Sequence, residues 1–178
     1  MVKLAEGSFN KVFLLTMDTG EQMIARIPHP NAGPAYYTTA SEVATMHYLR
    51  TKLQLPVPRV VAYSCDATNP VGSEYILMER ITGVNLSTKW PTLAVEKKIT
   101  ILDCLAQLQS KLLAVEVASY GNLYFITDIG TSLREPRMYK EASSDDDTYC
   151  IGPTTEKMFW KQDRSGPRGP CMVLDNLF

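Results

Sequence analysis

The residues best suited to chemistry are a loop of small side chains and a lone cation on a neighbouring strand. Gly7 and Ser8 lie in a tight turn before a run at residues 10–15, and Arg26 stands in a second apolar run at residues 23–27. Phosphate oxygens bind both backbone N–H groups and cationic side chains. The pattern therefore predicts a hairpin that covers a polyphosphate. The alternative is a plain surface hairpin whose Arg26 pairs with any nearby carboxylate.

This hairpin follows the kinase pattern of a glycine-rich loop, G-x-G-x-x-G-x-V, and a strand with the motif V-A-I-K. Ala5, Gly7 and Asn10 stand at the three glycine positions, and Val12 stands at the valine position. Residues 23–26, Met-Ile-Ala-Arg, replace V-A-I-K and place the arginine where the lysine would be. Asn10 suits a glycine position because asparagine adopts positive φ more readily than other non-glycine residues.

A helix predicted over residues 38–50 would bring a carboxylate to the cation. Its apolar positions recur every three or four residues and form one stripe, which consists of Val43, Met46, Leu49 and Leu53. Glu42 on this helix is expected to pair with Arg26. The alternative is a capping box, in which Glu42 bonds back to the N–H of Thr39.

Two further strands complete the predicted sheet. Residues 59–65 and 73–81 are rich in β-branched and apolar side chains and are separated by a turn. The run at 75–78 predicts a central strand that is covered on both faces. The chain leaves this strand through Gly83, and a long helix is expected between Thr92 and Val115.

This order of elements, with its motifs, resembles the aminoglycoside phosphotransferase and choline kinase-like family, and most closely its fungal group that includes the altered-inheritance-of-mitochondria proteins. The matching segments are residues 6–13, 25–28, 40–45, 56–58, 69–72, 75–79, 151–155 and 159–160. The resemblance implies an α+β protein with a kinase-like N-lobe, a five-stranded antiparallel sheet plus one helix, over residues 1–82. A hinge and the first helices of an incomplete helical C-lobe would follow over 83–125, and an irregular insertion and tail over 126–178.

The resemblance also implies an adenine nucleotide, ATP, as the bound ligand. Gly7, Ser8 and Asn10 would cover the phosphates, Arg26 would meet the α- and β-phosphates, and Glu42 would hold Arg26. In the adenine pocket the Glu79 carbonyl and the Ile81 N–H would bond the base, and Met78 would stand behind it, although simple core packing also explains a methionine there. The expected nucleotide-binding residues are Gly7, Ser8, Asn10, Val12, Arg26, Glu42, Met78, Glu79 and Ile81.

The catalytic part of the family pattern is not found in this chain. The family uses H-x-D-x-x-x-x-N and a later aspartate as catalytic base and Mg²⁺ ligands, but no histidine follows His47, and Asp175-Asn176 does not reproduce the spacing. The acidic run 145–147 is more consistent with a solvated loop than with a metal site. We therefore expect a truncated phosphotransferase-family chain, inactive alone, with no catalytic or metal residues. The alternative is a non-catalytic nucleotide-binding or interaction module, a pseudokinase remnant.

A truncated C-lobe would leave the 92–115 helix with an uncovered apolar face, so we expect marginal stability or a sticky surface. The net charge of −1 over 178 residues predicts neither a nucleic-acid nor a membrane partner, and the acceptor is not readable. Four scattered cysteines and the absence of a long apolar run or presequence favour an intracellular, by default cytoplasmic, protein. A mitochondrial location is implied only by the resemblance.

Overall fold

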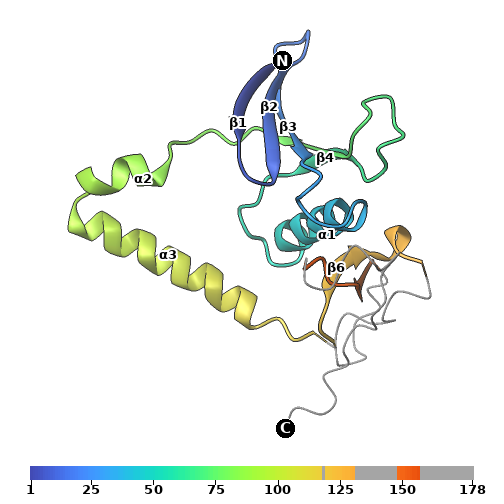
Figure 1. The fold of residues 1–178 in the computed structure, drawn as a ribbon. Coiled ribbons are helices and arrows are strands. Elements are labelled where there is room, and N and C mark those ends of the chain that lie inside the picture. The colour runs from blue at the N-terminus through green and yellow to red at the C-terminus, as the bar shows by residue number, and fades with distance from the viewer. Residues whose placement is uncertain (118, 131–147, 157–178) are drawn as a thin grey trace.

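A five-stranded antiparallel sheet with a helix on one face forms the N-terminal part of the molecule (Figure 1). The structure is a computed structural model that describes residues 1–117, 119–130 and 148–156. The sheet has the spatial order β1-β2-β3-β5-β4, and the predicted sheet with one helix is confirmed. Its elements are β1 (Val2–Glu6), β2 (Asn10–Thr16), β3 (Gln22–Pro28), α1 (Tyr37–Thr51), β4 (Val60–Ser64) and β5 (Tyr75–Glu79).

One face of the sheet builds a core against α1. Side chains that face each other across neighbouring strands share a face, so the register places Arg26 and Ile76 on one face with Val12. Ile76 and Met78 are buried in a cluster with Val43 of α1, whereas the intervening residues of β5 are only half-buried. The expectation that β5 is covered on both faces is therefore wrong, because α1 covers a single face of the sheet.

Helix α1 begins earlier than the capping-box interpretation requires. Its first residue is Tyr37, and no side chain at the N-cap position bonds the helix. Thr39 is buried inside the first turn, and its hydroxyl donates to Glu74 Oε2 at 2.6 Å. Glu74 Oε1 also accepts the N–H of Tyr36 at 2.9 Å. A carboxylate from the loop before β5 thus satisfies the helix end, and the capping box is not formed.

A two-stranded ribbon lies against α1 on the side away from the sheet (Figure 1). It consists of β6 (Asn122–Phe125), followed by the short helix η2 (Ile126–Asp128), and of β7 (Tyr149–Gly152). Tyr124 and Cys150 are fully buried in a cluster with Ala40. Helix α1 therefore lies between two sheets. The sequence at residues 120–125 predicts a short strand or a turn, and β6 shows that a strand forms there, whereas β7 was not predicted.

The remaining helices carry little buried surface. They are α2 (Leu86–Lys89), η1 (Trp90–Thr92) and α3 (Val95–Leu113). No residue of α3 is buried, and five of its large apolar side chains are at least half exposed: Val95, Ile99, Leu102, Leu105 and Leu113. The uncovered face expected for this helix is present. None of the helices in the described residues has both the length and the apolar character that are needed to cross a bilayer.

Several sequence predictions fall outside the described residues. They concern the acidic run 145–147, the matching pair Phe159-Trp160, and Asp175-Asn176. The division of the chain at residues 82 and 125 stays a prediction.

Candidate functional site

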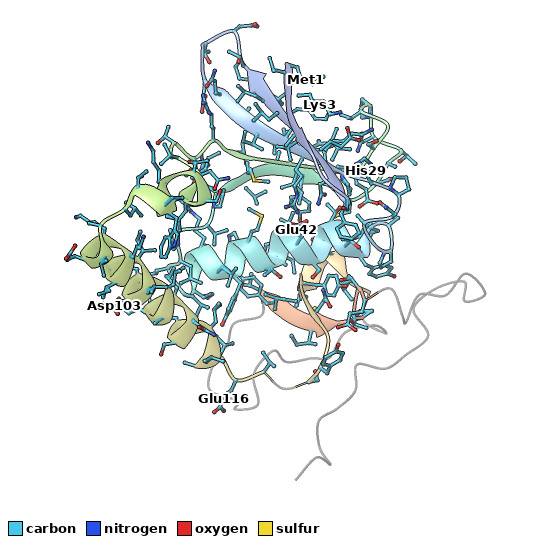
Figure 2. The ribbon with its side chains drawn as sticks, turned by 60° about the vertical axis from the view of Figure 1, so that its left-hand side comes forward. Met1, Lys3, His29, Glu42, Asp103 and Glu116 are labelled. Atoms are coloured by element: carbon cyan, nitrogen blue, oxygen red, sulfur yellow. The ribbon has the colours of Figure 1, made fainter. Side chains whose placement is uncertain are left out.

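The predicted partners Arg26 and Glu42 meet between the sheet and α1. The Arg26 guanidinium Nη2 forms an ion pair with Glu42 Oε1. Figure 2 shows Glu42 on the side of α1 that faces the strands. The ion pair, the sharper of the two interpretations of Glu42, is therefore confirmed. The side chain of Arg26 is 23% exposed and that of Glu42 is 33% exposed, so a ligand could still reach the charges.

Burial affects the pKa of the Arg26 guanidinium. Desolvation lowers the pKa of its guanidinium from the usual value, because removing water disfavours the charged form. An arginine pKa starts so high that the side chain stays charged, and the adjacent carboxylate favours that form. The pair thus presents a fixed cation on the inner face of β3.

The loop between β1 and β2 is held at both ends and exposed at its centre. The Gly7 N–H donates to the Asn10 carbonyl at 2.9 Å, and the His29 N–H donates to the Phe9 carbonyl at 2.8 Å. Gly7 and Ser8 are exposed, as is Phe9 at the tip. The first bond closes the loop on itself, and the second ties it to the residue that follows β3, the strand that carries Arg26.

Neither Gly7 nor Asn10 adopts a positive φ. The argument that Asn10 replaces a glycine through left-handed backbone is therefore wrong, since Asn10 is the first residue of β2 and pairs with Pro28. A Cβ on Gly7 would meet nothing within 4 Å. The small side chain at this position leaves open space in front of the loop, which is what a ligand that approaches the backbone requires.

The predicted hinge begins where β5 ends. Met78 is 8% exposed and packs against α1, so its core-packing role is observed and its place behind an adenine stays a prediction. The Glu79 carboxylate accepts from Arg50 Nη1 at 2.8 Å and from the Arg59 N–H at 2.9 Å. Ile81 is 59% exposed.

The register places the three predicted parts of the site in order along β3. Glu79 pairs with Met23, Arg26 lies three residues on and pairs with Val12 on β2, and the loop adjoins Pro28 through Asn10. A strand advances about 3.4 Å per residue, so hinge and cation are roughly 10 Å apart. The order is hinge, cation, loop. Val12 lies beside the cation on the same face.

Two further features were not predicted. A pocket of about 200 Å³ lies beside the N-terminus of α1 and contains none of the nine predicted residues. Its lining includes Pro28, His29, Gly33, Thr38, Ser73 and Glu74.

The ribbon is also tied to the sheet, because Asp128 Oδ2 accepts from the Tyr63 hydroxyl at 3.0 Å. The apolar run at 149–152 was the signal for this ribbon, but it is too short to distinguish a strand from a loop.

The residues around Asp128 are poor acids. Burial, and next the charge of Asp128, raises the pKa of the Tyr63 hydroxyl well above its usual range. Burial also raises the pKa of Cys65 to about 12, with smaller contributions from Asp128 and Glu74. The Tyr63 hydroxyl and the Cys65 thiol therefore stay protonated near neutral pH.

A metal-binding arrangement is not seen in the part of the chain that the structure describes: no three histidine, cysteine, aspartate or glutamate side chains gather closely enough to hold an ion. The described site offers a cation, a carboxylate that orients it, an open loop and a hinge.

The comparisons with known proteins point to one family. The model of the phosphotransferase enzyme family matches residues 1–148. A subtelomeric hrmA-associated cluster protein of Aspergillus fumigatus is 46% identical over 176 residues, which cover 97% of this chain and 33% of the relative. The altered inheritance of mitochondria protein 9, mitochondrial, of Candida tropicalis is 35% identical over 187 residues, which cover 99% of this chain and 30% of the relative. The chain thus spans about a third of the length of the curated relatives it matches.

Proposed function

Because the chain belongs to the phosphotransferase enzyme family, we propose that its sheet and α1 bind ATP in the manner of a kinase N-lobe. The single observation that carries the proposal is the ion pair of Arg26 with Glu42, at the middle of the order hinge, cation, loop along β3. An adenine at the hinge would place its phosphates toward Arg26 and then under residues 7–10. The base would thus lie at backbone hydrogen-bonding groups, and the phosphates would lie at a cation and at an open loop.

In this proposal each of the nine predicted residues has one task. The Glu79 carbonyl and the Ile81 N–H bond the adenine edge, and Met78 and Val12 contact the base. Arg26 binds the α- and β-phosphates with a planar, bidentate guanidinium, which is larger than the lysine of the family pattern. Glu42 orients Arg26, and Gly7, Ser8 and Asn10 cover the phosphates. Magnesium, when bound to the nucleotide, would neutralise phosphate charge.

Calorimetry with millimolar ATP tests this proposal on folded protein. We expect weak binding that Arg26→Ala reduces by about tenfold or more, because a charge-assisted contact to phosphate is lost. Arg80→Ala is the matched control, since Arg80 is exposed and its guanidinium donates to Gln22. The absence of heat with a folded chain, or an equal loss in both variants, would contradict the proposal.

The second candidate function is nucleotide binding without transfer. It requires only groups that the described residues supply, namely the ion pair of Arg26 with Glu42 and the open loop at residues 7–10. Incubation of the chain with ATP and Mg²⁺ separates the two functions. We expect no ATP consumption above background, and consumption that disappears in Arg26→Ala would instead establish an active phosphotransferase.

For location, we propose the mitochondrion, since the Candida relatives carry that word in their names. Expression of the chain with a C-terminal fluorescent tag in a fungal host tests this. A diffuse cytoplasmic signal would contradict it.

A further inference from the structure

The hydrogen bonds between Glu79 and Arg59 depart from those of a regular antiparallel pair. The Glu79 N–H donates to the Arg59 carbonyl at 2.9 Å. Two residues that face each other in this way normally exchange both backbone bonds, so that the Arg59 N–H would donate to the Glu79 carbonyl. Instead the Arg59 N–H donates to the Glu79 side-chain carboxylate, Oε1, at 2.9 Å. The carboxylate takes the position of the residue's own backbone acceptor.

The carboxylate is held in that position by α1. Arg50 Nη1 donates to Glu79 Oε1 at 2.8 Å and to the Val57 carbonyl at 2.6 Å. The Arg59 guanidinium Nε lies 4.0 Å from the other oxygen, Oε2. Hydrogen bonds to a charged acceptor are shorter and stronger than neutral ones, so the Arg59 N–H has a better partner than a backbone carbonyl. Glu79 is 29% exposed on its side chain, which limits competition from water.

We infer that the Glu79 side chain is a positioning group that keeps the Glu79 backbone carbonyl open to a ligand donor at the hinge. The inference rests on the proposed function, in which that carbonyl accepts a hydrogen bond from the amino group of adenine. The carbonyl is available because the donor expected for it, the Arg59 N–H, donates to the Glu79 carboxylate instead. The same arrangement would favour bases that carry an exocyclic amino donor over bases that lack one.

The hydrogen bond itself can be tested without nucleotide. In the full chain labelled with ¹⁵N-arginine and ¹³C-glutamate, scalar coupling across the hydrogen bond should connect the Arg59 amide nitrogen to the side-chain carboxyl carbon of Glu79. Coupling to the backbone carbonyl carbon of Glu79 would overturn the inference, whatever the chain binds.

The consequence for the ligand is tested by calorimetry with two probes, ATP and purine riboside triphosphate, which lacks the amino group. We expect the full chain to prefer ATP by roughly threefold to tenfold, the range of one hydrogen bond. Glu79→Ala should bring the ratio close to one, because the freed Arg59 N–H occupies the carbonyl. Glu79→Gln should keep the preference, since its amide oxygen accepts the same N–H. Circular dichroism verifies that each variant is folded.

The failures are distinguishable. If the chain binds ATP and Glu79→Ala keeps the full preference, the positioning role is wrong and the proposed function stands. If the chain binds neither probe, the proposed function is wrong and the role of the carbonyl toward a ligand is wrong with it, while the coupling still reports whether the carboxylate takes the Arg59 N–H.

Discussion

Arg26 carries its charge at a half-buried position, where desolvation disfavours the charge and the adjacent Glu42 carboxylate favours it. Desolvation lowers the pKa of the guanidinium, which means that the site disfavours the charge. Glu42 provides the compensating partner, at 33% exposure. A pair with this much solvent contact contributes modestly to folding, on the order of 1 kcal/mol. The larger consequence is geometric, because the carboxylate fixes where the cation points.

A double-mutant cycle on Arg26→Ala and Glu42→Ala measures that interaction. We expect a coupling free energy of about 1 kcal/mol in urea unfolding, since the two side chains contact each other directly. The control cycle pairs Glu42→Ala with Arg80→Ala, whose guanidinium donates to Gln22 on β3. Additive effects for Arg26 and Glu42 would show that the pair does not act as a unit.

Cys65 is a second residue whose surroundings decide its chemistry. Burial raises its pKa to about 12, and the thiolate is the reactive species. At pH 8 we expect iodoacetamide to modify Cys65 about a hundredfold or more slowly in the folded chain than in the urea-unfolded chain, because an ordinary thiol pKa is about 8.5. Mass spectrometry of individual peptides gives both rates. Equal rates would mean that the core around Cys65 opens readily.

The raised pKa of Cys65 also makes the free energy of unfolding depend on pH. The folded-state pKa of Cys65 lies above that of the unfolded chain, so the native state binds more protons between about pH 8.5 and 12. Its contribution to the free energy of unfolding is complete below pH 8.5 and is lost as the pH rises through that window. The raised pKa of Tyr63 acts in the same direction at higher pH.

At the scale of elements, α1 depends on a carboxylate that is distant in sequence. Glu74 accepts the Tyr36 N–H and the Thr39 hydroxyl, and the N-cap residue offers no side-chain bond of its own. Caps of this kind are worth roughly 1 kcal/mol. The loop before β5 therefore fixes the start of the helix that carries Glu42.

Glu74→Ala should lower the free energy of unfolding by roughly 1–2 kcal/mol, because the N–H and the buried hydroxyl lose their acceptor. Hydrogen exchange should accelerate first in the opening turn of α1. Glu74→Gln should cost less, since the amide oxygen still accepts one bond. Glu96→Ala, in the exposed first turn of α3, is the control. A loss spread evenly over the sheet would contradict a local capping role.

For the whole molecule, the features that were predicted correctly are those that depend on local sequence patterns. The order of five strands and one helix and the pairing of Arg26 with Glu42 were correct, because periodicity and motif spacing carry that information. The family resemblance was also correct. The nucleotide roles of the nine site residues stay predictions.

The features that sequence reasoning missed are long-range. Glu74 caps a helix that precedes it, Arg50 reaches Glu79, and Tyr149 packs on Tyr48. No rule of sequence spacing would identify the two partners of these contacts. The capping box failed for the same reason: Thr39 and Glu42 have the right spacing, but the fold begins the helix at Tyr37.

Helix α3 determines how the described chain should behave in solution. Its apolar side chains Leu102 and Leu105 are 54% and 51% exposed, and no residue of the helix is buried. Large contiguous apolar faces promote association. We therefore expect the chain to self-associate as its concentration rises, with light scattering that increases more steeply than for a well-covered domain of this size.

Replacement of these two leucines by glutamate should keep the chain monomeric to several-fold higher concentration, because the charges disrupt the apolar face. The free energy of unfolding should change by less than about 0.5 kcal/mol, since neither side chain leaves a packed core. Val43→Glu is the contrasting variant: Val43 is 2% exposed between α1 and the sheet, so it should unfold the chain. Unfolding caused by the α3 variant would show that this helix packs against the rest of the molecule in solution.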